Sequence, residues 1–165
     1  MIYRCLEPAL VTNVVGADWN FRIYKHHGHG VMFPHVDSCM GVICALTDDS
    51  IFACHISSFF QNDMNYPGAF DSLTNLLGVN QVQSAVVFGD IPTWNKMNVR
   101  PAWTKQITFI SDSCGNGVDA VLDVDTGAFK LMSYKAGRAD DDHSNVLVGG
   151  NINLYAIAAS SRVVC

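Results

Sequence analysis

Clusters of turn-forming residues divide the chain into short apolar runs, and this pattern limits the folds open to it more than any other feature. The clearest case is the pair of runs Gly41–Leu46 and Ile51–Ser58, which are joined by Thr47-Asp48-Asp49-Ser50. Short apolar runs on both sides of a polar, turn-forming cluster are typical of the two strands of a β-hairpin. The sequence therefore predicts a hairpin across residues 41–58.

Further short runs extend this pattern. The segment Asp125-Thr126-Gly127 separates Val118–Asp123 from Phe129–Tyr134 and predicts a second hairpin. Other apolar or alternating runs predict strands at residues 2–15, 19–25, 83–88, 107–111 and 151–159. Loops are expected at His26–Gly30 and Gly137–Asn145, and a turn at Pro34–Ser38.

One segment has a helical period instead. Phe70, Leu73, Leu76 and Leu77 have the spacing of one helix face, and Gly78 would end the helix. A regular alternation of strands and helices is missing, which argues against a doubly wound parallel sheet. We therefore expect an α+β fold with antiparallel, sandwich-like β-sheets and one or two flanking helices.

Length, charge and hydropathy restrict the partners. The 165 residues suit a single domain spanning 1–165, and 49% hydrophobic residues suffice for a core. The net charge of −5, without a run of Lys or Arg, argues against nucleic acid as a partner. We see no Sec signal, and no apolar run approaches the roughly 20 residues of a membrane span. We expect a monomer that binds neither nucleic acid nor membranes.

Cys39 and His55 are the best candidates for a catalytic pair. A thiol nucleophile reacts as the thiolate and needs a neighbouring base. In a hairpin that turns at residues 47–49, position 39 lies opposite positions 55–57. The two side chains would then lie on one face with Cβ atoms about 4.5–5.5 Å apart, while Cys54 would face the other side. The alternative is a core thiol beside a buried, hydrogen-bonded imidazole.

Other clusters are weaker candidates. The histidines could bind Zn²⁺ or Cu²⁺, or could belong to a loop that faces water; they are His26, His27, His29 and His35. The acidic residues could bind Ca²⁺ or could be solvated; they are Asp123, Asp125 and Asp140–Asp142. The six cysteines include no CxxC pair, so we expect mostly unpaired thiols and no metal.

The residues around the pair resemble a known family. The string Ser38-Cys39-Met40-Gly41-Val42, followed by His55, is similar to the motif of the chemoreceptor glutamine deamidases of the CheD family. Downstream, Leu73–Gly78 resembles the helix of that family and Ser84–Gly89 resembles one of its strands. The ordered similarity covers about residues 31–134. Toxin deamidases such as the cytotoxic necrotizing factors share the same Cys–His scaffold.

The resemblance implies a cysteine amidohydrolase that deamidates a Gln or Asn side chain of a protein substrate without a cofactor. Cys39 would be the nucleophile and His55 the base, with Ser38 and Asp37 bordering the substrate and oxyanion. Phe33 stands where the family has the Thr that orients the His, so the Phe33 backbone carbonyl would take that role.

Three other assignments stay open. Asp37 or Ser57 could orient the imidazole instead. The same pair could also serve a transglutaminase or a cysteine protease. In a non-enzymatic binding domain, both residues would be part of the core.

Departures from the family motif concern Phe33, Asp37 and Gly89-Asp90, and they fit a diverged bacterial toxin or effector better than a chemotaxis enzyme. Such a protein would be made in the bacterial cytoplasm and then secreted, or delivered into a target cell, without a Sec signal. A cognate inhibitor protein could accompany it.

Overall fold

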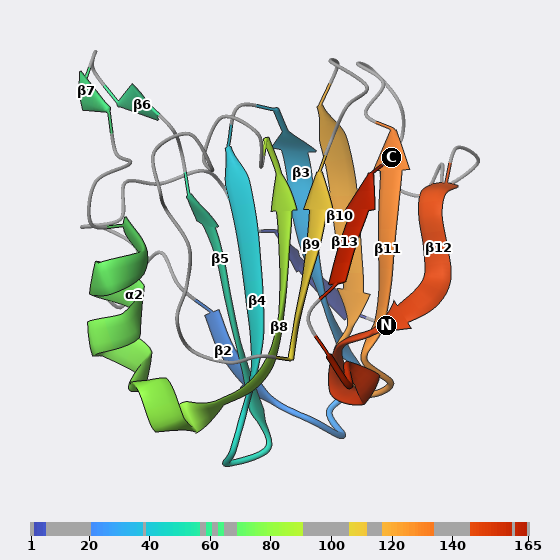
Figure 1. Cartoon of the computed structure of the whole chain (residues 1–165). Coiled ribbons are helices and arrows are strands. Elements are labelled where there is room, and N and C mark those ends of the chain that lie inside the picture. Colours follow the sequence, from blue (N-terminus) through green and yellow to red (C-terminus); the bar gives the residue numbers. More distant parts are fainter. Residues whose placement is uncertain are drawn as a thin grey trace.

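Two β-sheets packed face to face form the body of the protein, in a computed structural model of the chain (Figure 1). The structure describes residues 2–5, 21–37, 39–56, 59–60, 63–64, 69–90, 106–111, 117–133, 146–159 and 161–164. Most of the strand pairs are antiparallel and helices are few, which confirms the expected β-rich α+β fold. Within the described ranges, no helix is long and apolar enough to cross a membrane.

The first sheet contains the predicted hairpin at its centre. Its order is β13 (Ser161–Val164), β9 (Ile107–Ser111), β8 (Val82–Gly89), β4 (Met40–Leu46), β5 (Ser50–Ile56) and β2 (Phe21–Tyr24). Strand β4 pairs antiparallel with both β5 and β8, whereas β9 pairs parallel with β8 and β13. The central position of β4 means that residues at its start have neighbours on both sides.

The second sheet faces the first. Its order is β1 (Ile2–Cys5), β3 (His29–Val36), β10 (Val118–Asp123), β11 (Ala128–Ser133) and β12 (Val146–Asn153). All its neighbours are antiparallel except β1 and β3, which are parallel. The smaller elements are β6 (Phe59–Phe60), β7 (Asp63–Met64), α2 (Ala69–Leu77), η1 (Val79–Gln81) and η2 (Leu154–Ala156).

The hairpin of β4 and β5 is buried on both faces. Ile43 and Ala45 of β4 point into the core between the sheets, whereas Val42 and Cys44 point into a second core on the opposite face. Alternation of side chains along a strand produces this division. Both strands are buried along their whole length, so they appear in the sequence as continuous apolar runs.

Helix α2 covers that second core. Leu73 is fully buried there and Leu77 nearly so, whereas Leu76 is 42% exposed. Gly78 follows the helix with φ 77°, and its N–H donates to the Thr74 carbonyl over 2.8 Å. A left-handed residue after the last turn is a common helix ending, and glycine adopts it without steric cost. The helix predicted from the leucine spacing is therefore confirmed.

Strand β3 corrects the sequence prediction most. His29 and Gly30 were expected in a loop and Pro34–Val36 in a turn, but all of them belong to this strand. Pro34 interrupts the apolar run, which obscures the strand. It is tolerated because β1 pairs only with residues 29–32 and the pairing with β10 shifts register near residue 34.

The end of the chain also differs from the prediction. A single strand was expected at residues 151–159, but β12 ends at Asn153 and η2 follows. The Asn153 side chain accepts a hydrogen bond from the Tyr155 N–H, which starts the helical turn. The parts of the predictions that concern residues 6–20, 57–58 and 134–145 lie outside the described residues.

Candidate functional site

Cys39 precedes β4 directly, and the end of β8 fixes its backbone. The Asp90 N–H donates to the Cys39 carbonyl oxygen over 3.4 Å. Gly89 has φ 120°, and a Cβ at this position would lie 2.4 Å from the same oxygen. Only glycine permits this approach without strain. The Gly89-Asp90 pair noted in the sequence therefore positions the backbone of Cys39.

The end of β3 approaches the same region from the second sheet. His35 has φ 48°, a left-handed conformation that is uncommon outside glycine. Its N–H donates over 2.8 Å to Oδ1 of Asp119, a buried residue of β10. A Cβ at Gly117 would lie 3.0 Å from Cδ2 of His35. These contacts fix the end of β3 against β10. Unusual backbone conformations such as that of His35 concentrate at functional sites.

The hairpin register places Gly41 directly opposite His55. Cys39 is two positions before Gly41, so it lies diagonally from His55 rather than beside it. Diagonal neighbours on one face are about 7–8 Å apart between Cα atoms, which is farther than two directly opposite residues. Aromatic side chains reach across this distance, so the His55 ring rather than the short Cys39 side chain has to span it.

Both side chains belong to the same face of the hairpin. Cys39 packs against the core between the sheets, and Ala53 belongs to the same core. Ala53 is two residues before His55 on β5, so both point to the same face. The His55 ring meets the Phe33 ring of that core, with centroids 6.1 Å apart. The expectation that Cys39 and His55 share a face therefore agrees with the packing.

The imidazole lies beside a packed pair of phenylalanine rings, one of which contacts it. His55 is fully buried. Phe88 packs edge-on against Phe33 with centroids 4.9 Å apart, and its ring covers Gly41. A Cβ at Gly41 would lie 2.0 Å from Cζ of Phe88. The roles of Gly41 and Phe88 were not predicted, although a glycine inside an apolar strand is a known sign of close approach.

The thiols differ in their access to water. Cys5, Cys39, Cys44 and Cys54 are thiols in the structure, while Cys114 and Cys165 lie outside the described residues. Cys44 and Cys54 are buried on the face toward α2, and burial raises the pKa of both thiols. Cys39 is only partly buried. Of the thiols at Cys39, Cys44 and Cys54, which pack against the cores, that of Cys39 is the one that a reagent or substrate can approach.

The other predicted site residues have different outcomes. Phe33 does lie beside His55, and the contact that the structure shows is made by its ring; the role of its carbonyl stays a prediction. Asp37 is exposed, and its Cβ would lie 3.3 Å from a Cβ at Gly117. Ser38 and Ser57 lie outside the described residues.

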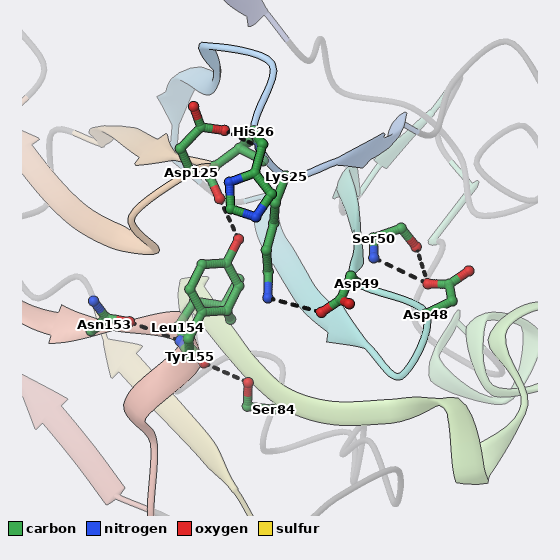
Figure 2. Close-up of polar contacts among 11 residues, drawn as sticks. Lys25, His26, Asp48, Asp49, Ser50, Ser84, Asp125, Asn153, Leu154 and Tyr155 are labelled. Atoms are coloured by element: carbon green, nitrogen blue, oxygen red, sulfur yellow. Dashed lines mark hydrogen bonds and ion pairs between the residues drawn. The ribbon is translucent and has the colours of Figure 1, made fainter.

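Asp125 joins the histidine-rich and acidic clusters. Its carboxylate accepts a hydrogen bond from the backbone N–H of His26 over 2.7 Å (Figure 2). It also accepts from the backbone N–H groups of His27 and Gly28 over 3.3 and 3.0 Å. Desolvation alone would raise the pKa of Asp125, but these N–H groups outweigh it and hold that pKa below its usual value. Asp125 thus anchors the loop.

The described part of the chain contains no group of three or more His, Cys, Asp or Glu residues arranged to hold a metal ion. The members of the predicted clusters at residues 140–142 lie outside it.

Comparisons with protein-family models, with curated proteins and with solved structures give no match to this chain. The family resemblance consequently rests on the motif around Cys39 and His55. The function has to be argued from the chemistry of that pair and its surroundings.

Proposed function

We propose that the protein is a cysteine-dependent amidohydrolase that deamidates a Gln or Asn side chain of a protein substrate. The observation that carries the proposal is the shared face of Cys39 and His55, with Cys39 partly exposed and His55 fully buried. A nucleophile at the surface with its base on the inner side allows a substrate to approach without displacing the base.

The reaction follows from the two groups. His55 takes the proton of the Cys39 thiol, and the thiolate attacks the carboxamide carbon of the substrate. Backbone N–H groups around Cys39 stabilise the tetrahedral oxyanion. His55 returns the proton to the leaving nitrogen, and ammonia departs to leave a thioester. Water, deprotonated by His55, then hydrolyses the thioester to the carboxylate and restores the thiol. This sequence uses no cofactor.

The surroundings of Cys39 support a side chain on a protein as substrate. Cys39 lies at one end of the sandwich, between the end of β3 and the end of β8. A Gln or Asn that projects from a partner surface can reach a partly exposed thiol there. The departures from the chemotaxis family at Phe33 and Asp37 favour a bacterial toxin or effector with its own target.

The test measures ammonia release and the amide-to-acid mass change in proteins of a host or bacterial lysate. We expect both with the wild-type protein, neither with Cys39→Ala, and both with the matched control Cys44→Ala. Equal release from wild type and Cys39→Ala would refute the assignment. If primary amines are incorporated in place of water, or if peptide bonds are cut, the pair serves a transglutaminase or a protease.

The complete burial of His55 favours a second candidate, a binding domain in which the pair is part of the core. Iodoacetamide separates the two. For an enzyme, Cys39 is labelled faster than Cys44 and Cys54, and His55→Asn slows that labelling. For a binding domain, labelling of Cys39 is slow and insensitive to His55→Asn.

A further inference from the structure

A cleft lies at the end of β8 remote from Cys39. Gly89 contacts Cys39 at one end of this strand, whereas Gln83 and Ser84 are at the other end. The cleft has a volume of about 420 Å³ and is lined by Lys25, Gln83, Ser84, Gln106, Tyr155 and Ile157. Sites for small molecules in proteins have volumes of about 300–1,000 Å³. The proposed deamidation uses none of these residues.

Hydrogen bonds fix one wall of the cleft. The Ser84 hydroxyl donates to the Leu154 carbonyl, which ties η2 to β8 (Figure 2). The Tyr155 N–H donates to Asn153 Oδ1 over 2.9 Å, and the Tyr155 hydroxyl donates to the Val124 carbonyl. This wall is therefore in place before a ligand arrives, which reduces the entropic cost of binding.

The charge of the lining is balanced. Nζ of Lys25 lies 3.4 Å from Oδ1 of Asp49 and 3.9 Å from the centroid of the Tyr155 ring. Burial raises the pKa of Tyr155, and the carboxylates of Asp125, Asp123 and Asp49 raise it further. Carboxylates close enough to act on Tyr155 counteract the attraction of Lys25 for an anion. Asp49 pairs with Lys25, the charged side chain of the lining, so the lining favours a ligand without net charge.

Two carboxamides supply the remaining polar groups. Gln83 and Gln106 are exposed and line the cleft from β8 and from the residue before β9. A carboxamide has two donor hydrogens and an oxygen with two lone pairs, so each can bond to a ligand beside any contact it already makes. Hydroxyl groups also donate and accept, and adjacent hydroxyls match a carboxamide on both counts.

We propose that this cleft binds a small neutral polyhydroxylated ligand, a mono- or disaccharide. Lys25, Gln83 and Gln106 would hydrogen-bond to the hydroxyls, and the side chain of Ile157 would meet the apolar face of the sugar ring. The proposal is independent of the deamidase assignment because it concerns binding at the opposite end of β8.

The test is a titration of the ¹⁵N-labelled protein followed by NMR. The probes are glucose, galactose, mannose, maltose, cellobiose, lactose and sucrose, with sodium acetate and sodium phosphate as anion probes. We expect at least one sugar to shift the amides of Gln83, Ser84, Gln106 and Tyr155 in a saturable way. The amides of Met40 and Asp90, next to Cys39, should not shift.

Variants locate the site. Gln83→Leu and Gln106→Leu should each weaken binding of that sugar about tenfold, because each removes hydrogen bonds at an exposed position. Gln81→Leu is the matched control, since Gln81 is an exposed carboxamide outside the cleft, and it should bind as wild type does. Absence of a saturable shift with every sugar at millimolar concentration would overturn the proposal, as would tighter binding of acetate or phosphate than of any sugar.

Discussion

Gly41→Ala tests the packing beside the candidate base. Gly41 pairs with His55 on one side and with Phe88 on the other. A methyl group at this position would lie 2.0, 2.4 and 2.5 Å from Cζ, Cε2 and Cε1 of Phe88. Carbon atoms that are not bonded prefer separations of about 3.5–4.0 Å, so the ring has to move.

The size of the destabilisation by Gly41→Ala follows from the neighbours of the Phe88 ring. Phe88 is fully buried, and it packs against Phe33 at 4.9 Å and Phe129 at 5.2 Å between centroids. Both neighbours are also fully buried, so the ring cannot yield without displacing them. Inserting an extra methyl into a filled core typically costs about 1–3 kcal/mol. We expect about 3 kcal/mol for Gly41→Ala, which corresponds to a fall of roughly 6–12 °C in Tm.

Urea denaturation of single and double variants isolates the clash. Phe88→Leu is destabilising by itself, but it should relieve part of the cost of Gly41→Ala, with a coupling energy of about 1–3 kcal/mol. Gly28→Ala is the control: nothing lies within 4 Å of its Cβ position and its strain comes only from φ 67°. Its effect should add to that of Phe88→Leu without coupling. A loss below about 1 kcal/mol for Gly41→Ala, or additivity with Phe88→Leu, would refute the packing argument.

Two further predictions concern the helix and the loop anchor. Leu73→Ala should lower the free energy of unfolding by about 2–5 kcal/mol because Leu73 of α2 is fully buried. Leu76→Ala, at an exposed position of the same helix, should change it by less than about 0.5 kcal/mol. Urea denaturation measures both, and equal losses would contradict the packing of α2. Asp125→Asn should destabilise the protein at neutral pH. Because the pKa of Asp125 is lowered in the folded state, its stabilisation is present above the unfolded-state pKa of about 3.9 and is lost as the pH falls through the folded value. The difference in unfolding free energy between wild type and Asp125→Asn should therefore shrink as the pH falls from neutral into the acid range, and a difference that stays constant over that range would contradict it.

The hairpin of β4 and β5 was predictable because its signals are local. Its strands follow from two apolar runs, and its turn follows from Asp48 and Asp49. The Asp48 Oδ1 accepts the N–H of Ser50 over 3.1 Å, and Asp49 has φ 62°, which Asp and Asn tolerate better than most residues. The shared face of Cys39 and His55 then follows from the two-residue period of strands.

The register within that hairpin was predictable only as a range. The expected partners of position 39 were residues 55–57, and a difference of two positions separates a direct pair from a diagonal one. The conformation of turn residues 47–49 decides whether Cys39 and His55 form a direct or a diagonal pair. The face on which a side chain lies depends only on whether its position along the strand is odd or even. Its nearest neighbour on the paired strand depends on the conformation of the turn between them.

Strand β3 was not predictable for a different reason. Its partners are β1, before it in the chain, and β10, which is more than eighty residues later. Pairing over such separations leaves no local pattern, and Pro34 hides the strand further. The family resemblance placed Phe33 beside His55 through its carbonyl, but the contact of its ring with the imidazole and the contact of His35 with Asp119 depend on this strand and were not predicted.

The candidate site is consequently a property of both sheets. The hairpin supplies Cys39 and His55, but the second sheet supplies the Phe33 ring against the imidazole. Removing water from a thiol–imidazole pair strengthens the attraction between thiolate and imidazolium and also raises the cost of forming them apart. The pair can therefore be reactive only while both sheets hold it in register. The packing that makes Gly41 intolerant of a methyl group lies next to this pair, because Gly41 is opposite His55 and two residues after Cys39.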